Sequence, residues 1–330
     1  MEIDFVVTWV DMDDPKWQND FAQYSGKINN AKNEVSEARF RDYGFLKYWF
    51  RGVEKYAPWV RKVHFVTCGQ KPEWLDETNP KLALVDHKDY IPNEFLPVFN
   101  SSLIEMYLHR IPDISEHFVY FNDDFYITNE LSPERFFVDG LPCDIAAFRH
   151  NLGLSLWNKC LKNNLKIINE RFDKKEVLKR DHDKWFLPDY GSRANLTKLL
   201  KWHNQFVTLK TPHNAQPYLK KTFEEVWDYA GDKLREASKN RFRSEKDYTQ
   251  ELFRTWQICQ SNFVAYNTYK DTKMFPLLIK SKQAINALRN QEYKLICLND
   301  NAHIRNYKKV IEELDAAFQE IFPEKSSFEK

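Results

Sequence analysis

The chain has 330 residues, and its 49 Lys and Arg side chains nearly balance its 48 Asp and Glu, which leaves a formal net charge of +1. Such a balance provides no overall positive field that would recruit nucleic acid or an acidic surface. With 42% hydrophobic and 15% aromatic residues, the composition argues against intrinsic disorder and indicates a globular protein with one large core or two modest ones.

Five short apolar runs, bounded by polar or turn residues, predict buried and mainly parallel β-strands. They span residues 3–10, 63–68, 82–85, 118–121 and 295–298. Helical patterns lie between them, including one that ends at Pro58 and one in which Ser102 and Glu105 fit a capping box. This repetition of strand, helix and strand predicts an α/β sheet flanked by helices.

The remainder of the chain is predicted to be largely helical. Residues 151–204 are dense in charge and are expected to form a peripheral, helical insertion. Further amphipathic helices are predicted near residues 222–234, where Thr222 and Glu225 fit a second capping box, and near 252–263 and 310–321. Residues 1–150 and 205–330 would then form one composite α/β domain.

Acidic residues follow the first predicted strand. Asp11, Asp13 and Asp14 place three carboxylates within four positions, and hard oxygen ligands of this kind suit Mg²⁺ or Mn²⁺ beside a nucleotide diphosphate. The same pattern is equally typical of an acidic turn in which Asp13 or Asp14 caps a helix. Trp9 fits a stacking platform and a core residue equally well.

Two further strands end in similar groups. Asn122, Asp123 and Asp124 follow the run at 118–121, and the adjacent carboxylates would repel each other unless a metal, another cation or solvent relieved them. That favours a metal or acid–base role over a solvated turn. Asn299 and Asp300 follow the run at 295–298; alone they are ordinary turn formers, but their repetition of the pattern suggests a shared site. Ligands of α/β sheets bind outside the carboxyl ends of the strands, so these segments are expected to meet at one cleft.

Basic residues and one histidine could complete such a site. The segments 39–42 (Arg-Phe-Arg-Asp) and 241–243 (Arg-Phe-Arg) each place two guanidinium groups around a phenylalanine, and arginine forks match phosphate oxygens. Either pair by itself is also typical of ordinary exposed arginines. His213 follows Pro212 in a predicted loop, from which an imidazole could move a proton near neutral pH.

Several other classes of site find no support. With only 8 Gly, the sequence contains neither G-x-G-x-x-G nor G-x-x-x-x-G-K-[S/T], which argues against the usual dinucleotide and P-loop cradles. Its 5 Cys lack disulfide or C-x-x-C spacing, as expected for a reducing compartment, and no run approaches the length of a membrane span. We therefore expect a cytoplasmic protein.

Taken in order, these motifs resemble the Stealth family of sugar-phosphate transferases. Asp4-Phe5-Val6-Val7-Thr8-Trp9-Val10-Asp11 is similar to the first conserved region of that family. The second region resembles the stretch from Arg39-Phe40-Arg41-Asp42 through Pro58-Trp59-Val60-Arg61 and Val66-Thr67-Cys68-Gly69-Gln70 to Phe121-Asn122-Asp123-Asp124. The third resembles Pro212-His213 through Arg241-Phe242-Arg243, and the fourth Cys297-Leu298-Asn299-Asp300.

The resemblance implies an activity and a fold. Hexose 1-phosphate or N-acetylhexosamine 1-phosphate would pass from a nucleotide sugar, expected to be UDP-linked, to a hydroxyl of a glycan acceptor in capsular or surface polysaccharide. A phosphodiester forms and the nucleoside monophosphate leaves. The implied fold is Rossmann-like, of the glycosyltransferase-A type, and the implied location is the cytoplasm, with peripheral association at the inner face of the membrane with capsule machinery.

The resemblance also implies roles for individual residues. His213, Asp123 and Arg241 would be catalytic, His213 either as a base that takes the acceptor proton or as an acid at the phosphoryl group. Mg²⁺ or Mn²⁺ would be held by Asp123, Asp124, Asn299 and Asp300. The donor would be bound by Thr8, Trp9, Asp11, Arg39, Asp42, Asn122 and Arg243.

Two alternatives remain open on the sequence. A metal-dependent glycosyltransferase that moves the sugar without phosphate needs the same acidic strand ends and a nucleotide sugar. A non-catalytic glycan-binding protein would use the 10 Trp and 16 Tyr as sugar platforms, although aromatic residues more often form a core and a lectin needs no clustered carboxylates with arginine pairs.

Overall fold

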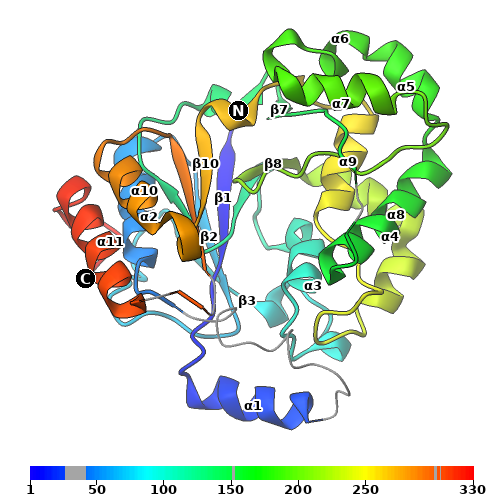
Figure 1. The fold of residues 1–330 in the computed structure, drawn as a ribbon. Helices are drawn as coiled ribbons and strands as arrows, with labels where there is room; N and C mark the ends of the chain where they lie inside the picture. The colour runs from blue at the N-terminus through cyan, green and yellow to red at the C-terminus, as the bar shows by residue number, and fades with distance from the viewer. Residues whose placement is uncertain (27–41, 151–152, 301–302, 305) are drawn as a thin grey trace.

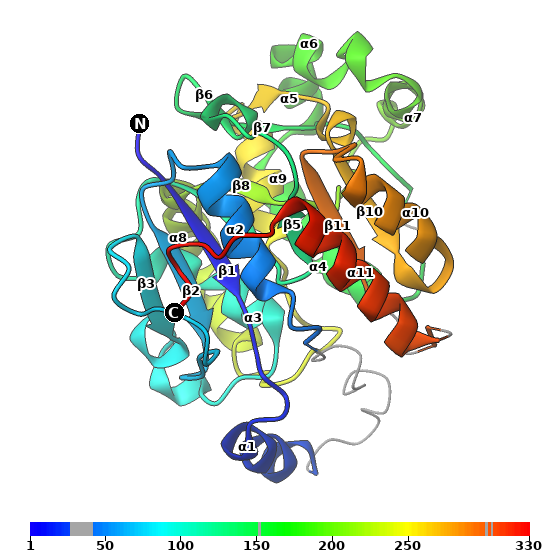
Figure 2. The ribbon, with the colours of Figure 1, turned by 90° about the vertical axis from the view of Figure 1, so that its left-hand side faces the viewer.

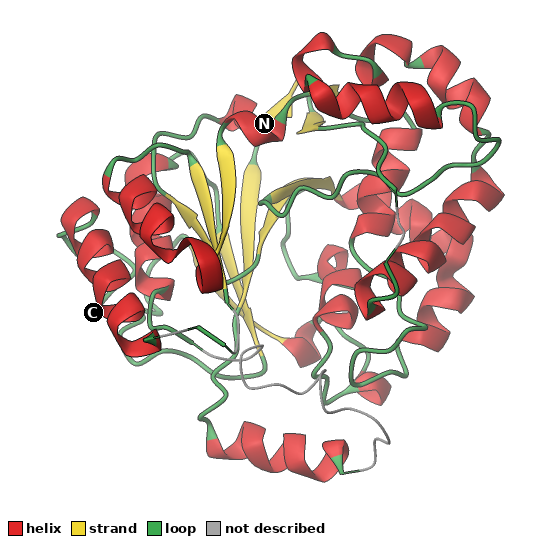
Figure 3. Ribbon diagram, in the orientation of Figure 1, coloured by secondary structure: helices red, strands yellow, loops and turns green. Residues whose placement is uncertain are grey.

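A computed structural model describes residues 1–330 except 27–41, 151–152, 301–302 and 305. Strands lie between two sets of helices (Figure 3). The main sheet has five strands in the order β3-β2-β1-β4-β8. Their bounds are β1 Ile3–Thr8, β2 Val63–Thr67, β3 Leu82–Asp86, β4 His117–Phe121 and β8 Gln216–Leu219.

The strand order places a crevice beside β1. Strands β1 to β4 are parallel, and only β8 runs antiparallel, against β4. The chain moves outward from β1 to β2 and β3, and then returns to place β4 on the other side of β1. In open α/β sheets, ligands bind at such a reversal, outside the carboxyl ends of the strands. Val7 of β1 pairs with Phe121 of β4, so the two strands end nearly level there.

The sheet separates two apolar cores, because alternate residues of a strand point to opposite faces. Phe5 and Val7 of β1 belong to one buried cluster, and Val6 belongs to the other. Helices α2 (Leu46–Tyr56), α10 (Leu277–Arg289) and α11 (Tyr307–Ile321) cover the first core and face the viewer in Figure 2. Helices α3 (Ser101–Met106), α4 (Leu156–Arg171), α8 (Lys220–Ala237) and α9 (Glu251–Cys259) lie on the other side (Figure 1).

The last predicted strand lies outside the main sheet, which corrects the expectation of a single sheet. Strand β11 (Leu295–Asn299) pairs parallel with β10 (Thr272–Pro276) and antiparallel with β5 (Phe125–Ile127) in a second sheet. Only residues 122–124 separate β4 from β5, so the acidic turn links the two sheets. Because β5 and β11 are antiparallel, the carboxyl end of β11 still meets this turn, and Leu298 N donates to Asp124 O at 2.9 Å.

The predicted helices are present, but two predicted caps are wrong. Asn100 caps α3 through its side chain, and Ser102 and Glu105 lie buried within the helix. The α8 cap is Leu219, without a side-chain bond, so Thr222 also lies inside its helix. By contrast, Asp14 caps α1 (Pro15–Ser25) by accepting from Trp17 N at 2.6 Å, which confirms the helix-cap interpretation for this residue.

The segment predicted to be a helical insertion is largely helical in its described part. Besides α4 it contains α5 (Lys174–Arg180), α6 (His182–Trp185) and α7 (Ser192–Leu200). Ile167, Trp185 and Leu200 pack into the same buried cluster as residues of α8 and α9. A third small sheet, formed by β6 (Phe137–Val138), β7 (Leu141–Asp144) and β9 (Val264–Ala265), lies beside it. No helix of the described residues is long and apolar enough to cross a membrane.

Candidate active site

A cleft with a volume of approximately 890 Å³ lies at the carboxyl ends of β1, β4 and β11. Segments that are far apart in the sequence line it together. The predicted site residues among its lining are Thr8, Trp9, Asp42, Asn122, Asp123, Asp124, His213, Arg243, Asn299 and Asp300.

The turn between β4 and β5 supplies two carboxylates. Asp123 lines the cleft, and part of its side chain is exposed to solvent. Desolvation by the surrounding protein raises the pKa of the Asp123 carboxyl to about 7, and the negative charges of Asp124 and Asp42 act in the same direction. Near neutral pH, Asp123 therefore titrates, as an acid–base group must, whereas a bound cation would keep its carboxylate ionised.

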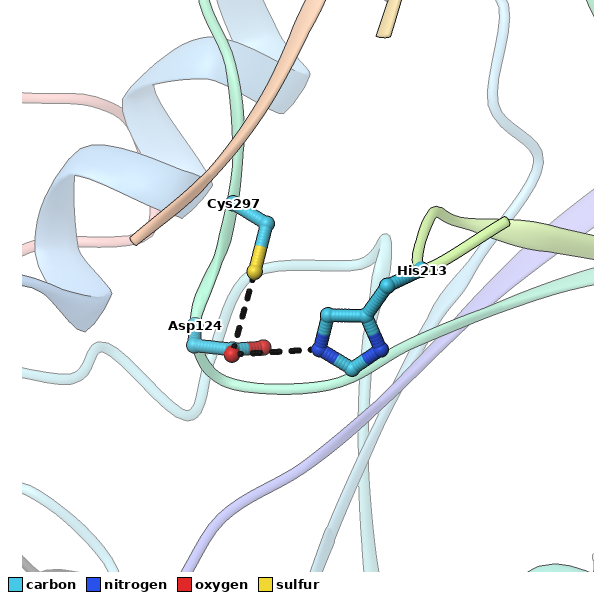
Figure 4. A group of neighbouring side chains, drawn as sticks. All are labelled: Asp124, His213 and Cys297. Carbon is cyan, nitrogen blue, oxygen red and sulfur yellow. Dashed lines mark hydrogen bonds and ion pairs between the residues drawn. The ribbon is translucent and has the colours of Figure 1, made fainter. Parts of the chain in front are cut away.

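Asp124 connects this turn to His213 and Cys297 (Figure 4). Its Oδ2 accepts from Cys297 Sγ at 3.2 Å and lies 3.4 Å from His213 Nε2. Burial lowers the pKa of the His213 imidazole, but the hydrogen bond to Asp124 and the charge of that carboxylate outweigh burial and raise this pKa overall. Burial raises the pKa of the Cys297 thiol well above its usual value, so the thiol is protonated and donates to Asp124.

The potential ligand atoms at this turn fit a bound cation. Asp124 Oδ1 is buried and has no hydrogen-bond partner among the described residues, and an orphaned carboxylate oxygen of this kind calls for a cation or another donor. Asp124, His213 and Cys297 also place one potential ligand atom each within 4.8 Å of one another. Carboxylate oxygens suit Mg²⁺ or Mn²⁺, whereas imidazole and thiolate suit Zn²⁺ better.

The end of β1 forms a second, braced part of the cleft. Trp9 is buried, packs against Phe65 and donates from its indole nitrogen to Asp42 Oδ2 at 3.0 Å. Asp42 also accepts from Gly44 N at 2.7 Å. The core interpretation of Trp9 is therefore confirmed, and because the residue also lines the cleft, its role as a stacking platform stays a prediction.

Sequence reasoning missed a carboxyl group that lies deeper in the cleft. Glu105 was assigned to a helix cap, but it is 6% exposed and accepts from Tyr120 Oη at 3.3 Å. Tyr120 Oη in turn lies 3.1 Å from Thr8 Oγ1, across β4 and β1. Burial raises the pKa of Glu105 to about 7, although Arg243 and Tyr120 act against this shift. The only signal in the sequence was a carboxylate inside an otherwise apolar helical stretch.

The two arginines of the 241–243 segment differ in position relative to the cleft. Arg243 lines the cleft and donates to Ser101 Oγ at 2.7 Å. Arg241 is not among the lining residues; it donates to the carbonyl oxygens of Pro97 at 2.9 Å and Glu94 at 3.3 Å, and it lies over the ring of Tyr24. In this structure Arg241 braces the loop before α3.

Two other predicted donor-binding residues are not placed in the cleft. Asp11 accepts from Asp13 N at 2.9 Å, and its backbone pairs with the side chain of Gln70. It organises the turn after β1 and is absent from the described lining of the cleft. Arg39 lies outside the described residues.

Comparisons with known proteins converge on one family. Residues 1–29, 39–143 and 286–330 match the models of Stealth protein conserved regions 1, 2 and 4. The chain is 40% identical over 336 residues to a capsular polysaccharide phosphotransferase of Streptococcus pneumoniae, covering 100% of this chain and 98% of the relative. It is 39% identical over 338 residues to a receptor polysaccharide phosphotransferase of Streptococcus oralis, covering 99% of each. An exopolysaccharide phosphotransferase of Lactiplantibacillus plantarum is 38% identical over 331 residues, covering 100% of this chain and 96% of the relative.

Proposed function

The chain belongs to the Stealth protein family, and from that membership and the cleft we propose that it is a sugar-1-phosphate transferase of surface polysaccharide synthesis. It takes hexose 1-phosphate or N-acetylhexosamine 1-phosphate from a UDP-linked sugar and attaches it to a hydroxyl of a glycan. The observation that carries the proposal is the convergence of the acidic turn, His213, Arg243 and the end of β11 on one cleft.

The reaction transfers a phosphoryl group. The acceptor oxygen attacks the phosphorus that bears the sugar, the bond from that phosphorus to the bridging oxygen breaks, and UMP leaves with the bridging oxygen. Such a transfer depends on positioning and charge neutralisation more than on covalent chemistry. A cleft of carboxylates with a nearby guanidinium and imidazole supplies these functions.

The roles proposed for individual residues follow from their positions in or near the cleft. His213, at 3.4 Å from Asp124, takes the proton of the acceptor hydroxyl, because Asp124 stabilises the imidazolium that forms. Asp123, Asp124, Asn299 and Asp300 would hold Mg²⁺ or Mn²⁺, and the cation would neutralise pyrophosphate charge when bound. Thr8, Trp9, Asp42, Asn122 and Arg243 bind the donor, and for Arg241 and Asp11 we propose support of the loops around it.

The broader assignments belong to the same proposal. The strand order 3-2-1-4 supports a Rossmann-like, glycosyltransferase-A-like arrangement, with residues 1–150 and 205–330 as the catalytic domain and 151–204 as the insertion. The resemblance of Pro212 through Arg243 to the third conserved region stays a prediction. Because nucleotide sugars are made in the cytoplasm, we place the protein there, in peripheral contact with capsule assembly at the membrane.

Tracking phosphorus through the reaction tests the proposal. The protein would be incubated with Mg²⁺ or Mn²⁺, a glycan acceptor from the producing strain and UDP-sugars labelled at the phosphorus next to the sugar. We expect UMP and a labelled glycan. Release of UDP with an unlabelled glycan would instead identify a glycosyltransferase, and glycan binding without turnover would identify a lectin. The matched control for His213→Ala is His182→Ala, because His182 is exposed and lies outside the described cleft lining.

A further inference from the structure

We propose that Trp157 and Asn214 form a subsite for a sugar ring of the acceptor glycan. The inference rests on the proposed function and adds where its second substrate binds. Both residues line the same cleft as Asp124 and His213. Trp157 lies in the first turn of α4 and Asn214 lies in the loop before β8, whereas the donor residues Thr8 and Trp9 lie at the end of β1.

Trp157 is a large aromatic side chain exposed within a concave site. Its side chain is 41% exposed, although most of the other tryptophans in the described residues are buried or half-buried. A cleft wall with an exposed indole face matches the C–H face of a pyranose ring, which is the apolar side of an otherwise polar ligand. An aromatic side chain also gives contact area at low conformational cost, because it has only two rotatable bonds.

The helix that carries Trp157 is firmly held beside the cleft. Ser155 caps the start of α4 by accepting from Asn158 N, and Lys159 pairs with Glu245 at 2.5 Å. Asn163 Nδ2 donates to the carbonyl oxygen of Glu245 at 2.9 Å. These contacts tie α4 to the segment just after Arg243, so the indole is presented by a fixed wall rather than by a loop.

Asn214 provides the polar half of the subsite. It is 9% exposed, and its Oδ1 is buried with no hydrogen-bond partner among the described residues. A buried carbonyl oxygen without a donor is costly and uncommon, so a ligand donor is the simplest explanation for it. A phosphate oxygen or an ionised carboxylate is an acceptor and cannot fill this role, whereas a sugar hydroxyl can donate.

The position of Asn214 in the chain favours the acceptor over the donor. It directly follows His213, the residue proposed to take the proton of the attacking hydroxyl. A hydrogen bond from one hydroxyl of the acceptor sugar to Asn214 would hold a neighbouring hydroxyl close to the imidazole. The subsite would thus select the acceptor and orient it at the same time.

Fluorine NMR of the full chain labelled with 5-fluorotryptophan tests this subsite directly. The signals of Trp157, Trp9 and Trp202 would be assigned with the three single Trp→Phe variants; Trp202 is 78% exposed and outside the described lining, so it is the control. The probes are UDP, UDP-N-acetylglucosamine and the methyl glycosides of glucose, galactose, N-acetylglucosamine, N-acetylgalactosamine and rhamnose. We expect at least one methyl glycoside to shift Trp157 but not Trp202, and UDP to shift Trp9 but not Trp157.

Two variants then separate binding from folding. Asn214→Leu should weaken binding of the methyl glycoside by about 5- to 10-fold, because one hydrogen bond to the ligand is lost. The change that UDP causes in the Trp9 signal should be kept. Trp157→Ala, read by glycoside titration calorimetry, covers the case in which Asn214→Leu does not fold. The subsite is overturned if no methyl glycoside shifts Trp157, if only UDP-N-acetylglucosamine does, or if both variants bind the glycoside like the wild type. A missing UDP response would count against the proposed function alone.

Discussion

Asp124 uses its two carboxylate oxygens differently. Oδ2 is engaged by Cys297 and His213, whereas Oδ1 is buried with no hydrogen-bond partner in the described part of the chain. One oxygen therefore controls the proton affinity of the histidine, and the other is available to a cation. In the proposed mechanism, a single residue would thus couple acid–base chemistry to metal binding.

Removing the charge of Asp124 should lower the pKa of His213. In Asp124→Asn the imidazole remains as enclosed as before but loses its charged partner, so burial, which favours the neutral form, is opposed only by the more distant charges of Glu251 and Glu105. An NMR titration of the imidazole resonances would measure the change. His109, which is buried elsewhere against Phe223, should titrate as in the wild type. An unchanged His213 titration would contradict the assigned role of Asp124.

His213→Ala should lower kcat by about 100-fold or more, because positioned proton transfer typically contributes that much. The KM for the donor should change far less, since the imidazole acts on the acceptor hydroxyl. Steady-state kinetics with both substrates would show this, with His182→Ala expected to match the wild type. Turnover within about tenfold of wild type would rule out proton transfer by His213.

For single residues, the sequence predicted which residue types form the site better than it predicted which side chains line the cleft. Acidic groups at strand ends were predicted to share a cleft; Asp123, Asp124 and Asp300 line it, whereas Asp11 is absent from its described lining. The prediction for Glu105 was wrong, because the same sequence pattern fits a capping box at the start of a helix and a carboxyl inside a helix that lines a cleft. Arg241 and Arg243 are two positions apart in one motif, yet only Arg243 lines the cleft, and that difference depends on packing around Pro97.

Helix α2 and strand β5 approach each other closely at a glycine. A Cβ built on Gly52 of α2 would lie only 2.5 Å from the carbonyl oxygen of Ile127 in β5. The absence of a side chain at this position lets the helix lie against the strand that follows the acidic turn. Since β5 is three residues long, a shift there would move Asp123 and Asp124 as well.

Gly52→Ala should therefore destabilise the protein by about 1–3 kcal/mol or more, because backbone atoms must move apart. Gly231→Ala in α8 is the control: its Cβ would meet only Trp227 at 3.8 Å, so it should stabilise the helix by about 0.5–1 kcal/mol. Denaturant unfolding of both variants would measure the difference. Equal stability of the two variants would show that the contact between α2 and β5 relaxes without cost.

The elements themselves were largely predictable, and their partners were not. The run at 295–298 was predicted as a strand, and β11 covers Leu295–Asn299. Its sheet was wrong, because apolar periodicity does not say which strand supplies the hydrogen bonds. The cap at Asn100 was missed for a similar reason: Asn100, Ser101 and Ser102 are all competent caps, and tertiary contacts of Asn100 with Asp247 decide among them.

At the scale of the whole molecule, carboxyl groups that are costly to ionise are concentrated in the cleft. Asp123 and Glu105 both have a pKa raised to about 7, and that of His213 is raised as well. Between the pKa of the unfolded carboxyl groups, near 4, and their folded values of about 7, the native protein therefore binds more protons than the unfolded chain. Under that condition the free energy of unfolding falls as pH rises.

The cleft should therefore make stability depend on pH and on cations together. Without a divalent cation, the melting temperature should fall between about pH 5.5 and 8, as Asp123 and Glu105 ionise and His213 loses its proton. Mg²⁺ at about one hundred times its Kd should restore on the order of 5 °C at the higher pH. At the lower pH its effect should be much smaller, because the cation must then displace protons from the same carboxyl groups.

Differential scanning calorimetry at both pH values, with Mg²⁺ or with a chelator, would measure this coupling, and Asp123→Asn provides the decisive comparison. The amide cannot ionise, so this variant should lose part of the pH-dependent fall in melting temperature and respond less to Mg²⁺. Asp183→Asn removes a fully exposed carboxylate on α6 and should behave like the wild type in both respects. If Mg²⁺ stabilised the protein equally at both pH values, or stabilised Asp123→Asn as much as the wild type, the cation would have to bind away from the acidic turn.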